Sequence, residues 1–277
     1  MSIVYGIVPH DDNASPLALK IEKAHPDKTG TPELESIYHT VPGFSAITNH
    51  PHLGRYFHSY HIAAANDEKP PQLAHLLQKM PEGSKTLTQL IVERKKSNGR
   101  MTIRELVQAL LHTAKGLAQL HQHNLAHRDV KPGNIMQVSM AEVEEGLFRW
   151  LLNDYDTVRK QGEVLEGNLV SGTIKYMSPE QFYNRSVEVQ SDVYSLTKIL
   201  YWCIEEYVAA SDRTYEYFAG HILDEKKITT RRELAKIINP MLETDPGERP
   251  PIARVIEQFE ALLKSDLQEL NAPLLGL

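Results

Sequence analysis

The stretch His127-Arg128-Asp129-Val130-Lys131-Pro132-Gly133-Asn134-Ile135 decides how this chain is interpreted. Asp129 and Lys131 are two residues apart, so in an extended segment their side chains point the same way. Asp129 can accept a proton from a hydroxyl nucleophile, and Lys131 can neutralise charge that grows on a transferred phosphoryl group. Asn134 adds a neutral oxygen ligand of the kind that Mg²⁺ binds. Taken alone, this stretch also fits a polar turn after a helix, so its companions decide between the two interpretations.

A second acidic segment follows an apolar strand pattern further along the chain. Leu151-Leu152-Asn153 leads into Asp154-Tyr155-Asp156, and Asp154 is a second hard-oxygen ligand for a cation. Phosphoryl transfer needs a metal site, positive charge and a positioned base. The two segments together contain all three.

At this point the sequence resembles the eukaryotic-type (Hanks-type) Ser/Thr protein kinases. Residues 127–134 match the catalytic-loop signature, and Asp154-Tyr155-Asp156 stands where that family has Asp-Phe-Gly. The resemblance implies that Asp129 and Lys131 are catalytic and that Asn134 and Asp154 hold the metal. Asp156 replaces a flexible glycine, which we expect to stiffen that turn.

Three later motifs follow in the order that this family shows. Gly172 to Glu180 resembles the end of the activation segment, with Ser178-Pro179-Glu180 in place of Ala-Pro-Glu. The resemblance implies that Glu180 pairs with Arg249 and that Asp192 holds the catalytic-loop backbone. The alternative for Glu180 and Arg249 is an ordinary surface ion pair. The alternative for Asp192 is an acidic residue at the N-terminus of a helix, where the helix dipole favours it.

Two details favour Ser or Thr as the phosphate acceptor. Lys131 stands two residues after Asp129, as in Ser/Thr kinases, and Gly172-Thr173 before Tyr176-Met177 is also their pattern. By the same resemblance, the hydroxyl of Thr173 would contact Asp129 and Lys131.

The N-terminal part matches the family less closely. Leu17-Ala18-Leu19-Lys20 resembles the strand whose lysine grips the α- and β-phosphates, although an edge strand with one lysine has the same pattern. Glu35 is the expected partner of Lys20, because Glu33 is already explained as a first-turn helix residue.

The expected nucleotide pocket has a reduced glycine loop, which would leave fewer backbone N–H groups for the phosphates. The resemblance places six residues around ATP: a loop glycine, apolar residues that sandwich adenine, a residue at the back of the pocket, and one that offers a backbone N–H. In that order they are Gly6; Val8, Ala18 and Met136; Leu77; and Met80.

We expect an α+β, bilobal kinase-like fold, with a small β-rich lobe over residues 1–80 and a larger helical lobe over 81–277. Pro81–Ser84 is the predicted hinge. The predicted strands cover 3–8, 15–23, 54–62 and 72–78, and the predicted helices begin at 31 and 102 and cover 178–182, 191–208, 232–243 and 252–269.

Composition narrows the function classes. Lys and Arg number 30 against 36 Asp and Glu, and this net charge of −6 argues against a general nucleic-acid binder. A single cysteine excludes an intramolecular disulfide and fits a cytoplasmic setting, or a host cytosol if the chain is an exported bacterial effector. We expect no signal peptide and no membrane span. The histidines between His50 and His75 invite a zinc interpretation, but they lack cysteine partners.

The sequence therefore predicts an enzyme that uses ATP and Mg²⁺, or Mn²⁺, to phosphorylate Ser or Thr hydroxyls of proteins. The alternative from another class is a catalytically impaired, kinase-like binding module, which the reduced glycine loop and Asp156 motivate. A third alternative, phosphate transfer to a small molecule, is disfavoured by residues 176–180, which resemble a peptide-docking shelf.

Overall fold

A computed structural model describes residues 3–7, 17–22, 41–62, 72–97, 99, 101–139, 148–164, 172–183, 186–204, 232–266 and 268–271. Its strands are β1 (Ile3–Ile7), β2 (Leu17–Glu22), β3 (Tyr56–Ile62), β4 (Gln72–Gln78), β5 (Lys85–Thr86), β6 (Leu125–Ala126), β7 (Ile135–Ser139), β8 (Phe148–Leu152) and β9 (Arg159–Lys160). Its helices are α2 (Phe44–Ile47), α3 (Leu87–Lys96), α4 (Ile103–His121), α5 (Pro179–Phe182), α6 (Gln190–Ile204), α9 (Arg232–Met241) and α10 (Ile252–Lys264). Its 3-10 turns are η1 (Pro132–Asn134), η2 (Ile174–Tyr176), η4 (Pro246–Glu248) and η5 (Gln268–Asn271).

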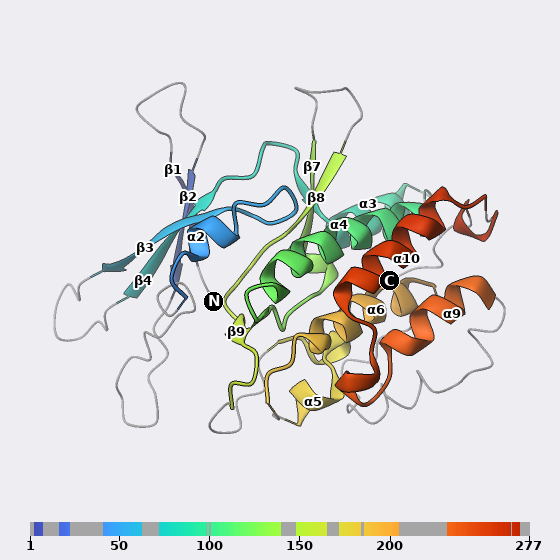
Figure 1. Cartoon of the computed structure of the whole chain (residues 1–277). Helices are drawn as coiled ribbons and strands as arrows, with labels where there is room; N and C mark the ends of the chain where they lie inside the picture. Colours follow the sequence, from blue (N-terminus) through green and yellow to red (C-terminus); the bar gives the residue numbers. More distant parts are fainter. Residues whose placement is uncertain are drawn as a thin grey trace.

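The molecule has a strand-rich part and a helix-rich part. Figure 1 shows β1 to β4 on one side, most of the helices on the other, and the β7–β8 hairpin between them. This arrangement confirms the predicted α+β, two-part fold. The boundary between residues 80 and 81 stays a prediction.

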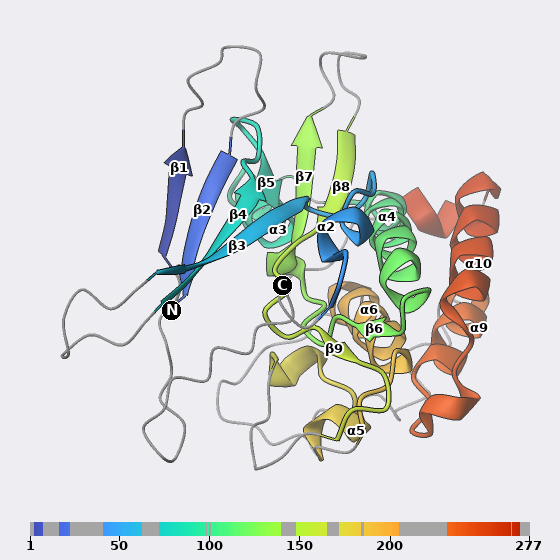
Figure 2. The same ribbon diagram turned by 60° about the vertical axis from the view of Figure 1, so that its left-hand side comes forward.

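The strand-rich part is one antiparallel sheet with the order β1-β2-β4-β3 (Figure 2). Lys20 lies on β2, opposite Val4 of β1 and His75 of β4, so its strand is not at the edge of the sheet. Ala18 and Lys20 are both buried and two residues apart, so they share one face of the sheet. The four strands confirm the predicted strand regions within the described residues.

Little can be said of the predicted helix that begins at residue 31, because residues 23–40 lie outside the described ranges. The turn predicted to end it is present, and Gly43 takes a φ of 74° there. The short helix α2 follows at once. Its buried Phe44 contacts Tyr155 edge-on, with ring centroids 5.4 Å apart.

Helix α3 was not predicted from the sequence, yet it has a clear start signal. The hydroxyl of Thr86 accepts from the backbone N–H of Gln89, and the Gln89 side chain accepts from the backbone N–H of Thr86 at 2.8 Å. This reciprocal pair is a capping box. Leu87 and Ile91 are buried, and the helix contacts η1, which contains Asn134.

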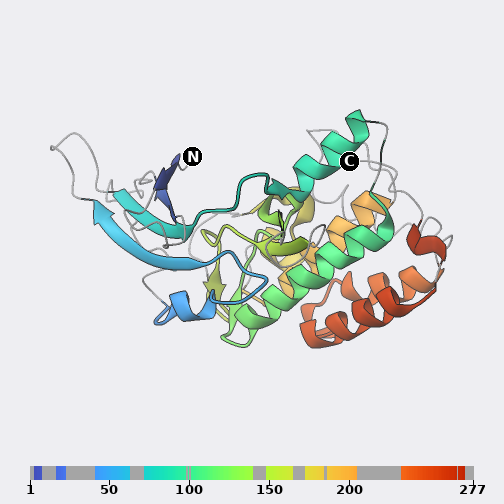
Figure 3. The same ribbon diagram turned by 90° about the horizontal axis from the view of Figure 1, so that it is seen from above.

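Helix α4 is the central helix of the larger part, and its predicted start is confirmed. Thr102 and Glu105 form the expected capping box, with the backbone N–H of Thr102 donating to Glu105 at 2.7 Å. Figure 3 shows α10 running beside α4. The apolar face of α4 is completely buried and consists of Leu106, Leu110, Ala114, Leu117 and Leu120.

A turn at residues 50–54 joins the sheet side to this helical core. The backbone N–H of Gly54 donates to the Leu152 carbonyl at 2.8 Å, and that of Leu152 donates to the His52 carbonyl at 3.0 Å. A Cβ at Gly116 of α4 would lie 2.7 Å from the same His52 carbonyl. Only glycine lets the turn approach the helix this closely.

Helix α10 ends before the predicted boundary at residue 269. Ser265 has an extended backbone, and its hydroxyl donates to the Leu262 carbonyl at 2.6 Å. Arg104 of α4 donates to the Leu263 carbonyl at 2.7 Å. These side chains satisfy the last carbonyls, so the helix stops without needing another turn.

Among the described residues, no helix has the length and apolar character to cross a bilayer. Over the same residues, no three His, Cys, Asp or Glu side chains are grouped so as to hold a metal. His52 stacks instead on His112, with ring centroids 4.3 Å apart.

Candidate active site

The segment from β6 to η1 is held by one buried acid. Asp192, at the start of α6, has no exposed surface and accepts from the backbone N–H groups of His127 and Arg128, each at 2.8 Å. His121 also reaches it, at 2.9 Å. Arg128 takes a left-handed φ of 67°, which these bonds help to fix. Asp192 therefore holds the loop backbone, as the resemblance implies, and does more than favour its own helix.

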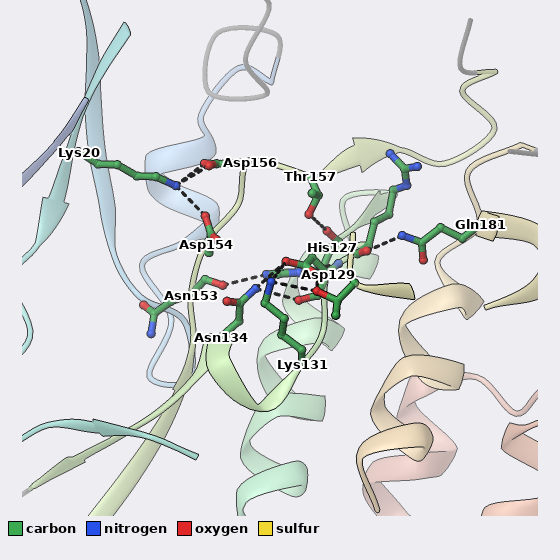
Figure 4. A network of polar contacts seen from close by, with 12 residues as sticks. Lys20, His127, Asp129, Lys131, Asn134, Asn153, Asp154, Asp156, Thr157 and Gln181 are labelled. Carbon is green, nitrogen blue, oxygen red and sulfur yellow. Dashed lines mark hydrogen bonds and ion pairs between the residues drawn. The ribbon is translucent and has the colours of Figure 1, made fainter. Parts of the chain in front are cut away.

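The side chains of Lys131 and Asn134 converge on Asp129 (Figure 4). Lys131 donates to Asp129 Oδ2 at 2.6 Å, and the hydroxyl of Thr173 donates to Oδ1 at 2.9 Å. Lys131 also donates to Thr173 at 3.1 Å, which closes the triangle. Thr173 thus makes both predicted contacts, and the carboxylate has a fixed orientation.

Asn134 is oriented by the same acid. Its amide nitrogen donates to the Asp129 carbonyl at 2.9 Å and to Asp129 Oδ2 at 3.1 Å. The amide oxygen is consequently the atom that can coordinate a cation. Asn134 and Asp154 offer hard oxygen donors, which fit Mg²⁺ or Mn²⁺ better than zinc.

The segment Asp154-Tyr155-Asp156 follows β8 and is fixed through its middle residue. The buried phenol of Tyr155 donates to the Gly54 carbonyl at 2.6 Å. Asp154 takes a φ of 69°, and its side chain is 41% exposed. A Cβ at Gly54 would lie 1.7 Å from the side-chain oxygen of Asn153, so a larger residue at position 54 would force that side chain to move.

Lys20 reaches this segment from the sheet and meets two carboxylates (Figure 4). Its ammonium lies 2.6 Å from Asp154 Oδ1 and 2.6 Å from each carboxylate oxygen of Asp156. Burial lowers the pKa of Lys20, but the charges of Asp156 and Asp154 outweigh it, so the pKa is raised above its ordinary value. The predicted partner, Glu35, lies outside the described residues.

The expected nucleotide-pocket residues are only partly placed. Gly6 lies within β1, opposite Ala18, and Leu77 of β4 lies on the other side of Ala18. Met80 follows β4 and is partly buried, as is Met136 on β7. Val8 lies outside the described residues. Gly6 is thus part of a strand, in agreement with the strand predicted over residues 3–8, and its role in binding phosphate stays a prediction.

Glu180 and Arg249 form a buried pair. Both guanidinium nitrogens donate to the carboxylate, at 2.7 and 2.8 Å, and the hydroxyl of Ser191 donates to it at 2.6 Å. The two charged side chains are 4% and 0% exposed. The alternative of an ordinary surface ion pair is therefore wrong. The buried pair anchors α5, which carries Glu180 and follows Thr173 in the chain.

Sequence reasoning missed two residues that position the catalytic segment. Gln181 donates to the Arg128 carbonyl at 2.5 Å, and Thr157 donates to the His127 carbonyl at 2.7 Å. Gly172 has a φ of 118°, and a Cβ there would lie 2.7 Å from the Arg128 carbonyl. Of these three residues, only Gly172 belongs to a motif that could be identified in the sequence. Polar residues such as Gln181 and Thr157 form hydrogen bonds in many kinds of local structure, so their identity alone does not predict this role.

The comparisons with known proteins agree with this geometry. A family model described as the protein kinase domain matches residues 1–259. Serine/threonine-protein kinase PknA of Mycobacterium tuberculosis is 28% identical over 187 residues, which cover 67% of this chain and 39% of that protein. Serine/threonine-protein kinase STY46 of Arabidopsis thaliana is 23% identical over 201 residues, which cover 71% of this chain and 33% of that protein. The chain spans well under half the length of these curated relatives, but the family match covers most of its own length: it belongs to the protein kinase family.

Proposed function

We propose that this chain transfers the γ-phosphate of ATP to Ser or Thr hydroxyls of proteins. Protein kinases as a family use ATP and a divalent metal. The observation that carries the proposal is the triangle of Asp129, Lys131 and Thr173, because it holds a carboxyl group and an amine 2.6 Å apart, with one hydroxyl in contact with both. Both relatives described above are named serine/threonine-protein kinases, which supports the choice of acceptor.

In the proposed mechanism, the substrate hydroxyl donates to the Asp129 carboxylate, which orients the oxygen and accepts its proton. The hydroxyl oxygen forms a bond to the γ-phosphorus while the bond from that phosphorus to the bridging oxygen breaks, and ADP leaves with that oxygen. Lys131, 2.6 Å from that carboxylate, stabilises negative charge on the transferred group. Lys20 binds the phosphates that stay on the leaving nucleotide.

Asn134 and Asp154 are the residues that would hold the metal. Asn134 is suited to this because Asp129 engages its amide nitrogen and leaves its oxygen for a cation. Bound Mg²⁺ would supply positive charge against the phosphate oxygens. Mn²⁺ accepts the same oxygen donors.

The test is phosphate transfer from radiolabelled ATP with Mg²⁺, to casein and to the chain itself, for the natural sequence and for Asp129→Ala. We expect the substitution to lower the rate by about a hundredfold or more. Glu257→Gln, at an exposed pair on α10, removes a charge far from the site and should leave the rate unchanged. Activity that survives Asp129→Ala would refute the assigned role, and ATP binding without turnover would refute the proposed activity. A cytoplasmic location stays a prediction.

A further inference from the structure

Asp156 makes more contacts with Lys20 than the metal-binding candidate Asp154 does. Both of its oxygens lie 2.6 Å from the ammonium, whereas Asp154 contributes one oxygen. The side chain of Lys20 is only 11% exposed. An ammonium this deeply buried needs a negatively charged partner, because an unpaired charge removed from water is strongly destabilising.

The turn that carries Asp156 is fixed on both sides. Tyr155, before it, is buried and donates to the Gly54 carbonyl at 2.6 Å. Thr157, after it, donates to the His127 carbonyl at 2.7 Å. The carboxylate of Asp156 is thus carried by a backbone segment that hydrogen bonds fix on both sides. Such preorganisation is what a group that positions another group requires.

If the proposed function holds, the carboxylates of Asp154 and Asp156 have different roles. Lys20 uses only Oδ1 of Asp154, so a metal ion at that residue would share its single negative charge with the ammonium and weaken its attraction for Lys20. Asp156 would then remain as the acid that keeps Lys20 in place. A glycine at position 156, as the resemblance implies for the family, has no side chain with which to do this.

We propose that Asp156 is a positioning residue, which holds the Lys20 ammonium toward the nucleotide phosphates while Asp154 binds the metal. This inference rests on the proposed function. It adds a second acidic partner to the expected Glu35. It also gives a function to Asp156, whose departure from the family pattern first suggested an impaired enzyme.

The opposite possibility is that Asp156 competes with the nucleotide for Lys20. The two can be separated, because a positioning carboxylate strengthens nucleotide binding and a competing one weakens it. Asp156→Asn keeps the size of the side chain, removes its charge and leaves one of the two oxygens that accept from Lys20. Asp156→Glu keeps the charge and moves it by one methylene.

The first experiment measures Lys20 directly and needs no turnover. Acetylation of Lys20 by sulfosuccinimidyl acetate is followed by mass spectrometry as a function of pH. In Asp156→Asn the rate profile should shift to lower pH, because the neutral amine forms more readily without the carboxylate. Asp156→Glu should retain most of the natural profile, and Glu257→Gln all of it.

The second experiment measures the nucleotide. For Asp156→Asn we expect the KM for ATP to rise about tenfold, the effect of losing one strong charged hydrogen bond, with a smaller change in kcat. A Kd for ATP from calorimetry should move in the same direction. If phosphate transfer is absent in every variant, the proposed function fails, while the acetylation profile and the Kd still test Asp156.

Three results would overturn the assignment. One is an unchanged acetylation profile in Asp156→Asn, and another is tighter ATP binding by that variant. The third is a larger shift of the profile in Glu35→Gln than in Asp156→Asn. Asp156→Glu and Asp156→Asn are both compared with the natural chain by urea unfolding, so that a folding defect is not read as a change at Lys20.

Discussion

Replacing Arg249 with leucine should destabilise the chain more than any exposed substitution. Its guanidinium donates to both oxygens of Glu180, and to the carbonyls of Glu243 at 2.7 Å, Gln190 at 3.0 Å and Thr244 at 3.2 Å. Leucine satisfies none of these acceptors. The substitution therefore leaves a buried carboxylate and three carbonyls that have lost their donor.

The expected loss follows from burial. Removing one member of a buried pair costs about 3–5 kcal/mol, out of the 5–15 kcal/mol that typically stabilises a domain. Burial alone raises the pKa of Glu180, and the hydrogen bonds and charge of Arg249, with help from Ser191, bring it below the ordinary 4.5. Without Arg249 the burial effect remains and the pKa of Glu180 rises. The loss should accordingly be largest at neutral pH and shrink as the pH falls and Glu180 takes up a proton.

The assay is urea unfolding followed by tryptophan fluorescence, at pH 7.5 and at pH 5.5. The matched control is Arg254→Leu, which removes an arginine from an exposed pair with Glu257 and should cost about 0.5 kcal/mol. The double variant Glu180→Leu with Arg249→Leu should recover part of the loss, since no buried charge is left alone. A loss for Arg249→Leu no larger than that of the control, at both pH values, would refute this reasoning.

Two further predictions concern the junction between the sheet and the helical core. Burial lowers the pKa values of His52 and His112 from 6.5 to about 4, so the unfolded chain binds protons more readily and the unfolding free energy should fall as the pH drops from 6.5 towards 4. His112→Asn should make that fall shallower in urea titrations; an equally steep fall would contradict the assignment. Tyr155→Phe leaves the Gly54 carbonyl without its phenol donor and should cost about 1–2 kcal/mol, measured against the exposed Tyr183→Phe, and equal losses for the two variants would count against it.

Local motifs carried most of what could be predicted about the helical part. Thr102 and Glu105 form the predicted capping box because both partners lie within one turn of chain. Asp192 and Arg249 could be paired with distant partners only through the resemblance, since spacing alone does not bring residues 128 and 192 together. The structure places them as the resemblance implied.

The errors have equally local causes. Helix α3 was not predicted, although Thr86 and Gln89 form the same kind of capping box as the one that begins α4. The apolar periodicity within α3 is weak, because its buried residues are Leu87 and Ile91. The end of α10 was predicted too late because the apolar pattern continues past Lys264. The helix ends there because Ser265 has an extended backbone and its hydroxyl donates to the Leu262 carbonyl. Periodicity reports which face is buried, and end-capping side chains decide where a helix stops.

The lysine partner could not have been predicted by counting residues. Glu35 was chosen by its distance in sequence from Lys20. Asp156 is 136 residues away from Lys20, and it follows β8, which pairs at Leu152 with Leu53 in the turn before β3. In sequence, Asp156 stood out only as a missing glycine, which argued for a stiffer and weaker site. In the structure the same carboxylate lies against a buried ammonium, on a turn fixed at Tyr155 and Thr157. A departure from a family pattern therefore has to be judged by what the new side chain contacts, because the contact and not the departure determines whether the site gains or loses a function.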